Sequence, residues 1–482
     1  MMQFLLNQQR ISIEEIDPNM TVLRYLREEK HKCGTKEGCA SGDCGACTVV
    51  LASVTDGELQ YQTVNSCLTP VSALQGKQLI TVEDLQQGEQ LHPVQQAMVD
   101  SHASQCGFCT PGFVMSLFAL SKQPIHHPQH QIEQALAGNL CRCTGYRPIL
   151  DAARQITSQT TIMDAFIHWQ EDTRQQLSKM VTEHIETLHY QDRVCYLPKT
   201  LPQLAALYRQ FPEARLVAGG TDLMLAVTRN HQRFSTLIAL KEVTELKQCL
   251  HQGESLVIGA GASLNQVAEF LSEYIPVTKT FFERFASLQI RNQGTLAGNL
   301  ANASPVGDCA PMLLAMGAQL VLQQGNTQRQ IPLDEFFVGY RQTLLQPGEF
   351  IHSIIIPSLS DCQSLYLRKI SKRLDDDISA VFAAINLTLD AEDVVTSARI
   401  AFGGMAATPA RAVGCETTLI GKRLSTQTIE QACQALATDF TPLSDFRASA
   451  DYRRQVAANL LRHWYFCHCA PRDVMEIADY VS

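Results

Sequence analysis

The stretch that decides the fold of the first part of the chain is Gly38-Cys39-Ala40-Ser41-Gly42-Asp43-Cys44-Gly45-Ala46-Cys47. With Cys67 it gives the spacing Cys39-x4-Cys44-x2-Cys47-x19-Cys67, the plant-type pattern for a [2Fe–2S] cluster. Thiolates that converge on an anionic cluster need inward backbone N–H groups and residues that tolerate positive φ, and Gly38, Gly42 and Gly45 meet that need. A structural zinc site favours paired Cys-x2-4-Cys units and suits this triple poorly. We therefore predict an iron–sulfur ligand set here.

Four further cysteines lie downstream with the spacing Cys106-x2-Cys109-x31-Cys141-x-Cys143. A Cys-x2-Cys unit also serves zinc and dithiol redox sites, so this set is ambiguous by itself. Cys109 precedes Thr110-Pro111, and Cys143 lies shortly before Arg147-Pro148, which predicts helix starts beside the sulfurs. Helix N-termini stabilise an anionic cluster through their dipoles and unpaired N–H groups. A second cluster, held between helical hairpins, is the favoured interpretation.

The composition indicates a folded, multidomain protein. At 482 residues the chain exceeds the size at which one core stops growing, so we expect about two to four domains. The net charge of −9 argues against a nucleic-acid partner. We find neither a signal peptide nor an apolar run of about 18 residues, so we expect a cytoplasmic protein without a membrane partner. In that compartment seventeen cysteines favour metal or redox chemistry over disulfides.

Local patterns predict the order of the elements. Before residue 90 we expect a hairpin, a short helix capped by Thr21, and two further strands. Between 91 and 165 four helices are expected, and after Pro198 strands alternate with helices. The strands are expected at 3–7, 11–16, 48–51, 78–82, 214–218, 237–240, 256–258, 319–322, 383–389 and 397–401. The fold class is therefore multidomain α+β.

The predicted domains follow from these shifts in pattern. They are a ferredoxin-like β-grasp [2Fe–2S] domain at 1–90, a four-helix [2Fe–2S] domain at 91–165, a partly helical linker at 166–195, an α+β FAD-binding domain at 196–357 and a smaller C-terminal α+β domain at 358–482.

Two glycine-containing loops could hold a pyrophosphate, Val217–Asp222 and Gly294–Asp308. Such loops supply backbone N–H donors at close approach together with small hydroxyl groups. By spacing alone, an ordinary turn explains them equally well. The segment Val257–Ser263 resembles a Rossmann loop, but it lacks the third glycine and the acidic residue about 20 positions on. We interpret it as a tight strand-to-helix turn.

Two motifs carry a family resemblance, Gln105–Gly112 and Cys141–Tyr146. They resemble the iron–sulfur part of the molybdenum hydroxylases, which include xanthine dehydrogenase and aldehyde oxidase. The first quartet resembles the ferredoxin-like domain of the same family, and the resemblance runs through residues 1 to 157. It implies a helical-domain cluster next to a molybdopterin cofactor, which Gln105 approaches.

Both glycine-containing loops look like the FAD-binding loops of that family, so the resemblance implies FAD. The implied FAD-binding residues are Leu216, Val217, Ala218, Gly219, Gly220, Thr221, Asp222, Phe285, Thr295, Asn299, Asp308, Ile351 and Lys369. Lys369 and Arg373 are the implied catalytic residues, which would tune the flavin. Tyr340 and Asp376 are the implied contacts to NAD+. A solvated charge cluster on a turn is the alternative for the run 369–378.

Fused members of the family continue into a longer molybdopterin domain, whereas this sequence stops at Ser482. The resemblance therefore implies the small, iron–sulfur and FAD subunit of a xanthine dehydrogenase. A large subunit would bind molybdopterin, in an α2β2 assembly, and oxidise hypoxanthine or xanthine to urate. Electrons would pass through the Cys106 cluster, the Cys39 cluster and FAD to NAD+. The alternatives are an electron-transfer subunit of an aldehyde oxidase-type enzyme and a cluster-based redox sensor.

Overall fold

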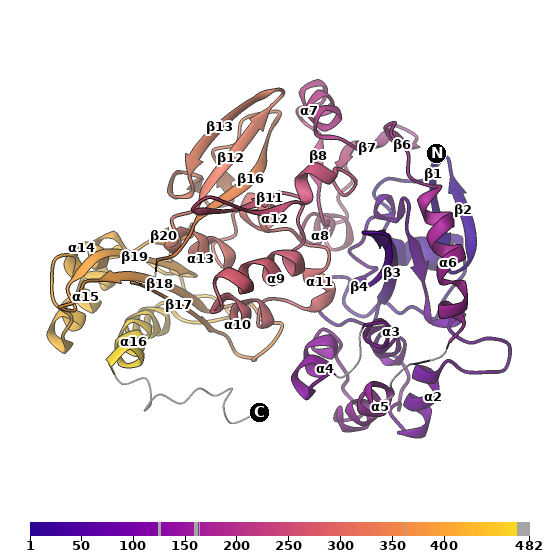
Figure 1. The fold of residues 1–482 in the computed structure, drawn as a ribbon, viewed down its shortest axis with the longest axis horizontal. Helices are drawn as coiled ribbons and strands as arrows, with labels where there is room; N and C mark the ends of the chain where they lie inside the picture. The colour runs from indigo at the N-terminus through magenta and orange to yellow at the C-terminus, as the bar shows by residue number, and fades with distance from the viewer. Residues whose placement is uncertain (124–126, 159–161, 163, 361, 470–482) are drawn as a thin grey trace. The chain divides into compact units, whose positions relative to one another are not determined.

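The computed structural model describes residues 1–123, 127–158, 162, 164–360 and 362–469 (Figure 1). The end of the last predicted domain, 470–482, lies outside the described residues. The chain forms two compact units. The first contains Met1–Thr244 and the segment Ser287–Gly294, and the second contains Glu245–Ala286 and the chain from Thr295 onward.

The first sheet has the strand order β2-β1-β5-β3-β4. Strands β1 and β2 form the predicted hairpin, β5 runs parallel to β1, and β3 pairs antiparallel with β5 and β4. The bounds are β1 Met2–Leu6, β2 Gln9–Ile13, β3 Thr48–Thr55, β4 Glu58–Asn65 and β5 Gln78–Ile80. The Thr21 hydroxyl accepts from the Arg24 N–H and caps α1 (Val22–Arg24), which continues as a helical turn to Glu29. The predicted ferredoxin-like β-grasp domain is confirmed.

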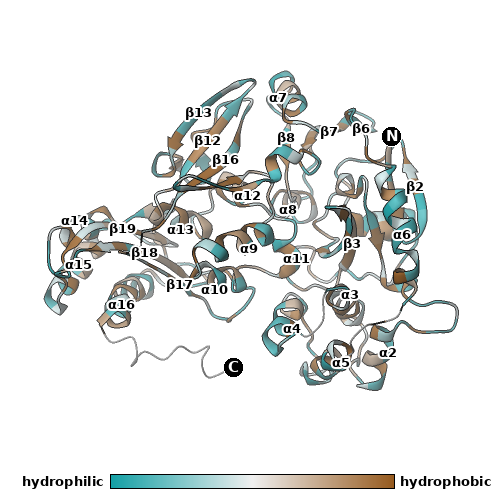
Figure 2. Cartoon of the chain, in the orientation of Figure 1, coloured by the Kyte–Doolittle hydropathy of each residue, from teal (hydrophilic) through white to brown (hydrophobic). Residues whose placement is uncertain are grey.

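The inner strand β3 is buried on both faces of this sheet. Val49 and Leu51 enter one apolar core, while Val50 and Ala52 enter another, because successive strand residues point to opposite faces. The edge strand β2 is teal in Figure 2, which marks its polar, solvent-facing side chains. The sheet therefore offers two apolar surfaces on which other elements pack.

Helices α2 to α5 cover one of these surfaces and form the predicted helical domain (Figure 1). Their bounds are α2 Pro93–Asp100, α3 Thr110–Ser121, α4 Gln129–Leu136 and α5 Arg147–Thr157. Three of them carry proline in the first turn, where its missing N–H has no cost. Helix α3 is the central one, because nearly all of its residues are buried.

The range 166–195, expected to be a linker, contains regular structure. It holds most of α6 (Ala165–Ser178), then β6 (Glu186–Tyr190) and the start of β7 (Arg193–Leu197). These strands open a second sheet, ordered β6-β7-β9-β8, with β8 at Arg215–Val217, β9 at Thr236–Ala239, α7 at Leu201–Gln210 and α8 at Leu223–Thr228.

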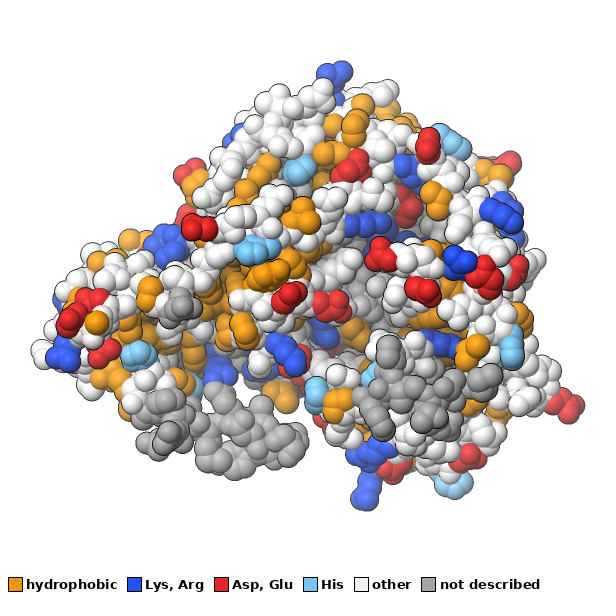
Figure 3. All heavy atoms as spheres, viewed as in Figure 1, with side chains coloured by type: hydrophobic (Ala, Val, Ile, Leu, Met, Phe, Trp, Pro, Cys, Tyr) orange, Lys and Arg blue, Asp and Glu red, His pale blue; other side chains and the backbone are white. Residues whose placement is uncertain are grey.

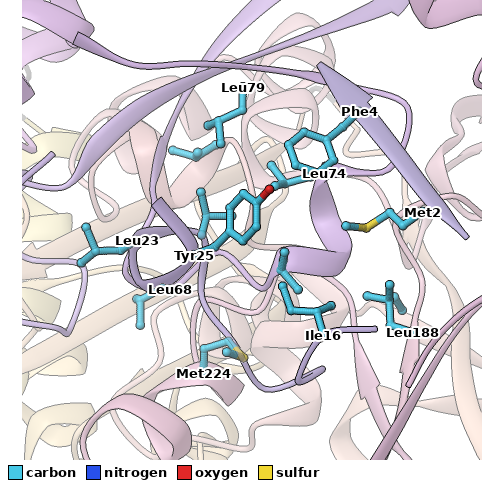
Figure 4. Packing of buried hydrophobic residues seen from close by; sticks show 14 of the residues in the cluster. Met2, Phe4, Ile16, Leu23, Tyr25, Leu68, Leu74, Leu79, Leu188 and Met224 are labelled. Atoms are coloured by element: carbon cyan, nitrogen blue, oxygen red, sulfur yellow. The ribbon is translucent and has the colours of Figure 1, made fainter. Parts of the chain in front are cut away.

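The second apolar surface of the first sheet packs against this second sheet in one continuous core. Figure 4 shows Phe4, Tyr25 and Leu79 together with Leu188 of β6 and Met224 of α8. The Phe4 and Tyr25 rings meet edge to face, with 5.9 Å between their centroids. This shared core is the physical reason why the start of the flavin half belongs to the same unit as both cysteine quartets.

The second unit has two larger sheets and one small hairpin. The first sheet is ordered β10-β11-β16-β12-β13, the second β17-β18-β19-β20, and β14 and β15 form the hairpin. The strand bounds are β10 Cys249–Gln252, β11 Ser255–Gly259, β12 Gln319–Gln324, β13 Thr327–Pro332, β14 Phe337–Gly339, β15 Gln342–Thr343, β16 Glu349–Pro357, β17 Gln363–Ile370, β18 Val381–Leu389, β19 Val395–Gly403 and β20 Ala410–Arg411.

Helices surround both of these sheets. Their bounds are α9 Leu264–Tyr274, α10 Thr278–Glu283, α12 Leu296–Ala301, α13 Cys309–Ala315, α14 Val413–Leu419, α15 Thr426–Asp439 and α16 Ala450–Cys469, while α11 (Leu288–Arg291) belongs to the first unit. The segment Val257–Ser263 contains the end of β11 and the expected tight turn into α9, and Ser263 caps that helix. The α+β fold class is confirmed for both units.

No helix among the described residues is both long and apolar enough to cross a bilayer. On the face shown in Figure 3, acidic and basic side chains of the described residues are interspersed, without an extended basic area.

Candidate iron–sulfur and flavin sites

The cysteines of each predicted quartet are arranged as two pairs. Thiol hydrogen bonds join Cys39 to Cys44 and Cys47 to Cys67 in the first quartet. In the second quartet they join Cys106 to Cys143 and Cys109 to Cys141. A [2Fe–2S] cluster takes two protein ligands on each iron, so two sulfur pairs are the arrangement that it requires. Among the described residues, no three His, Cys, Asp or Glu side chains converge as ligands for a single metal ion.

The loop of the first quartet favours thiolates. The Cys44 thiol and the backbone N–H of Ser41, which lies 3.4 Å from the sulfur, help to lower the pKa of Cys39 to about 4. Gly42 and Gly45 have φ of 81° and 65°, which confirms that part of the loop needs positive φ. Gly38 is required for a different reason, because a Cβ there would lie 2.9 Å from the Cys44 sulfur. These features fit a bound cluster.

The second quartet lies at two helix starts. Cys109 is the residue directly before α3, and Cys143 precedes the turn that leads to α5. Burial raises the pKa of Cys141, but hydrogen bonds from the Thr144 hydroxyl and N–H, at 3.1 and 3.4 Å, lower it overall. Cys106 and Cys143 are exposed, so this quartet lies close to the surface of its unit.

The two quartets are joined by direct backbone contacts. The Leu140 N–H donates to the carbonyl oxygen of Cys44 at 3.0 Å, and the Asn139 amide donates to that of Gly45 at 3.0 Å. A Cβ at Gly45 would overlap the carbonyl oxygen of Gly138. The loop of the first quartet therefore packs directly on the segment before Cys141.

The predicted pyrophosphate loop, Leu216–Asp222, lies beside the first quartet in the same unit. A Cβ at Gly219 would overlap the Gln293 carbonyl, and Gly220 has φ of 76°. A Cβ at Gly220 would lie 3.2 Å from the oxygen of Leu68, which follows Cys67. In helix α8, which follows the loop, Thr228 donates to the oxygen of Ala40 at 2.8 Å. The two glycines therefore let the loop pack closely against the backbone around Gln293 and Leu68. Glycine-containing loops with backbone N–H donors are the kind that bind a pyrophosphate.

In the second unit, Asn299 and Asp308 each keep a buried oxygen, Oδ1, that has no hydrogen-bond partner among the described residues. Buried acceptors of this kind are costly unless something else satisfies them. A ligand that donates hydroxyl or N–H groups, as FAD does, fits them. Thr295 caps α12 by accepting from the Gly298 N–H at 3.0 Å, so its hydroxyl oxygen has a structural partner.

Lys369 and Asp308 form a buried ion pair of 3.0 Å, and the Ser379 hydroxyl donates to the same carboxylate at 2.9 Å. The Lys369 ammonium also lies 6.0 Å from the centre of the Phe285 ring. Three of the predicted residues are thus brought together. Ile351 is buried in β16.

Sequence reasoning missed Arg284, which donates to the carbonyl oxygens of Lys369 and Leu374, both at 3.2 Å. It braces the start of the run 369–378 against α10. No sequence signal identifies this role, because the acceptors are backbone atoms about 90 residues away.

Arg373, Asp376 and Tyr340 lie on more exposed backbone. Arg373 is exposed and pairs with Asp377 at 3.3 Å, and it also donates to the oxygen of Asp376 at 3.5 Å. Asp376 sits in a turn with φ of 47°. Tyr340 follows β14 and is 62% exposed.

Four family models match the chain in succession. Residues 4–72 match a 2Fe-2S iron-sulfur cluster binding domain, and residues 81–154 match a [2Fe-2S] binding domain. Residues 188–359 match the FAD binding domain in molybdopterin dehydrogenase, and residues 366–466 match the CO dehydrogenase flavoprotein C-terminal domain. In succession, the four matches indicate two [2Fe–2S] cluster-binding domains followed by flavin domains like those of molybdopterin dehydrogenase and CO dehydrogenase flavoprotein.

Curated xanthine dehydrogenases align with almost the whole chain. It is 34% identical to the xanthine dehydrogenase of Emericella nidulans and 33% identical to that of Drosophila subobscura, over 96% and 95% of its length. It spans 38% of the length of each of these relatives. Among solved structures, the carbon monoxide dehydrogenase from Hydrogenophaga pseudoflava aligns with a TM-score of 0.53 and 27% identity, over 56% of this chain and 94% of that one.

Proposed function

We propose that the chain is the electron-transfer subunit of a xanthine dehydrogenase. It would carry electrons from the oxidation of hypoxanthine or xanthine to urate, at a molybdopterin partner, through to NAD+. Clusters exchange single electrons and FAD exchanges two, so together they connect a two-electron oxidation to hydride transfer. The chain would supply the sulfur ligands of the clusters, the loop that binds FAD and the charged groups that tune the potentials of the clusters and of FAD.

The observation that carries this proposal is the alignment of xanthine dehydrogenases with 96% of the chain, through both quartets and both flavin domains. The paired sulfurs and the orphaned oxygens of Asn299 and Asp308 support the cofactor assignment independently.

Within this function, we assign FAD to the loop Leu216–Asp222 and to Phe285, Thr295, Asn299, Asp308, Ile351 and Lys369. Lys369 and Arg373 would tune the flavin, and Tyr340 and Asp376 would contact NAD+. The exposure of Tyr340 and the turn at Asp376 support a role toward a soluble co-substrate. The predicted domain order, with boundaries at 90, 165, 195 and 357, belongs to the same proposal, and the order of the family models supports that order. The flavin-domain match begins at residue 188, and β7 spans residue 195.

The partner would be a molybdopterin-binding large subunit in a cytoplasmic α2β2 assembly. The second quartet would face that partner, with Gln105 toward its cofactor. Support comes from exposed Cys106 and Cys143 and from the neighbouring Phe108 and Tyr146, whose large side chains are also exposed. The first quartet would face the flavin, since the cradle glycines pack beside Leu68.

Purification of the chain with its partner tests the function. We expect reduction of NAD+ that depends on hypoxanthine or xanthine, and about four iron, four sulfide and one FAD per chain. A complex that oxidises aldehydes or carbon monoxide but no purine would support the alternative of a different molybdenum hydroxylase, which the carbon monoxide dehydrogenase likeness favours. A chain with iron but without FAD would contradict both and favour a sensor.

A further inference from the structure

The segment Ser287–Gly294 lies within the flavin-domain match, yet it packs in the compact unit that holds both quartets. Four polar residues between Leu288 and Gly294 are buried: Gln289, Arg291, Asn292 and Gln293. Burial of amide and guanidinium groups is unfavourable unless they are hydrogen-bonded. The hydrogen-bond partners of these side chains therefore indicate which elements the segment holds together.

Gln289 is fully buried and reaches both cluster domains with one amide group. Its Nε2 lies 3.2 Å from Asn139 Oδ1 and 3.3 Å from Ser116 Oγ in the helical domain. The same nitrogen lies 3.5 Å from Thr48 Oγ1 at the start of β3 in the ferredoxin-like domain. One side chain of the flavin half thus contacts the frameworks of both quartets.

The acceptors of Gln289 are bonded to one another. Ser116 donates to Asn139 Oδ1 at 2.7 Å, and Asn139 Nδ2 donates to Thr48 Oγ1 at 3.2 Å and to the Gly45 oxygen at 3.0 Å. Gly45 lies between Cys44 and Cys47, and Asn139 lies two residues before Cys141. The network therefore reaches the Gly45 backbone in the loop of the first quartet and, through the Asn139 side chain, the segment just before Cys141.

Gln289 packs so closely on Gly138, and Gly138 on Gly45, that none of these residues can shift without a steric clash. A Cβ at Gly138 would overlap Gln289 Oε1, and a Cβ at Gly45 would overlap the Gly138 oxygen. Backbone and side chain are thus layered directly, from Gln289 through Gly138 to Gly45. Movement of Gln289 would loosen the packing of Gly138 and Asn139 against the first loop, while the backbone bond from Leu140 to Cys44 stays in place.

We propose that Gln289 is a positioning residue that holds the two quartets at a fixed separation and so sets the rate of electron transfer between their clusters. The inference rests on the proposed function, which places a cluster on each quartet. Electron transfer between centres slows steeply with distance, so a small relaxation of this network has a large kinetic effect. Gln289 itself touches no ligand sulfur, so both clusters would still assemble without its amide.

The test uses Gln289→Met in the full, cofactor-loaded chain, with Asn292→Leu as the matched control. Asn292 is a buried amide in the same segment, and among the described residues its Nδ2 donates to Thr63 of β4 and to neither quartet's framework. The readouts are iron content, the magnetic interaction between the two reduced clusters in electron paramagnetic resonance, and the rate at which the second cluster is reduced after the first. We expect Gln289→Met to keep both clusters, to change their interaction and to slow that step several-fold, while Asn292→Leu leaves the interaction and rate unchanged.

A native interaction and a native rate in Gln289→Met would overturn the inference. If Gln289→Met loses iron, the same magnetic interaction is measured in Ser116→Ala, which removes a single hydroxyl from the network and is a milder change. An altered interaction in Ser116→Ala supports the inference, and a native one overturns it. The absence of two clusters from the unsubstituted chain would instead contradict the proposed function.

Discussion

The backbone N–H of Leu140 donates a hydrogen bond of 3.0 Å to the carbonyl oxygen of Cys44. Leu140 directly precedes Cys141, so one hydrogen bond connects a residue beside a ligand of the second quartet to a ligand of the first. The bond belongs to the backbone and does not depend on a side chain. The bond places the two quartets next to each other within one compact unit, although they belong to two different domains.

Cys106→Ser should remove one cluster and leave the other. Its partner Cys143 would lose the second sulfur of its pair, whereas the pairs Cys39/Cys44 and Cys47/Cys67 stay intact. We expect iron and sulfide to fall by about half, with one of the two paramagnetic resonance signals retained. Cys33→Ser is the control, because Cys33 is exposed and lies outside both quartets. Loss of both signals in Cys106→Ser would contradict the separate sites.

Gly219→Ala should release FAD. The added methyl would overlap the Gln293 carbonyl and displace the loop from its cradle. Gly57→Ala, in the β3–β4 turn, is the control. Gly57 has positive φ, and its Cβ would meet no atom within 4 Å, so alanine at this position costs only about 1–2 kcal/mol of stability. Flavin content by absorbance is the measurement, and full FAD occupancy in Gly219→Ala would be the contradicting result.

Lys369→Met should destabilise the second unit and weaken flavin binding. It leaves the Asp308 carboxylate buried without its cation, which costs about 3–5 kcal/mol. In Lys369→Met/Asp308→Leu the buried charge is gone, so we expect most of that stability to return while FAD stays weakly bound. Unfolding in urea and FAD titration separate the two effects. If the double variant binds FAD normally, neither side chain serves the flavin.

The helical domain should lose stability in acid through Asp164. Its carboxylate accepts from His92 Nε2 at 2.8 Å and pairs with the buried Lys122, beside the Phe118 and Phe166 rings. Burial raises the pKa of Asp164, but these two partners lower it overall. A carboxyl whose folded pKa is lowered stabilises the protein above its unfolded pKa of about 3.9, and that contribution is lost as pH falls through the folded value.

Urea unfolding followed by the fluorescence of Trp169 in α6 measures this effect, in a Trp464→Phe background that leaves a single tryptophan. Asp164→Asn should be less stable at neutral pH and should show a weaker acid dependence. Asp151→Asn is the control, since Asp151 is half exposed and forms a surface ion pair with Arg154, a contact worth about 0–1 kcal/mol. Equal acid dependence in Asp164→Asn and the unsubstituted protein would contradict the assignment.

The ligand sets and most elements could be predicted because their causes are local. Three of the four ligands in the first quartet lie within nine residues, and proline or a capping side chain marks the starts of α2, α3 and α5. The strands β6 and β7 were missed because the range 166–195 as a whole is rich in polar residues. They are held in place by the core that they share with Phe4 and Tyr25. The predicted flavin contacts rested on resemblance rather than on pattern.

By itself, the sequence determined which cysteines stand together, where helices begin and which glycines a ligand loop requires, since these depend on neighbours along the chain. Only the tertiary structure decided how the sulfurs pair, that Lys369 meets Asp308 across 61 residues, and that Gln289 reaches the frameworks of both quartets. Such contacts arise when separate elements bury a common apolar surface. Packing of that kind selects partners by shape and burial, which no local spacing in the sequence records.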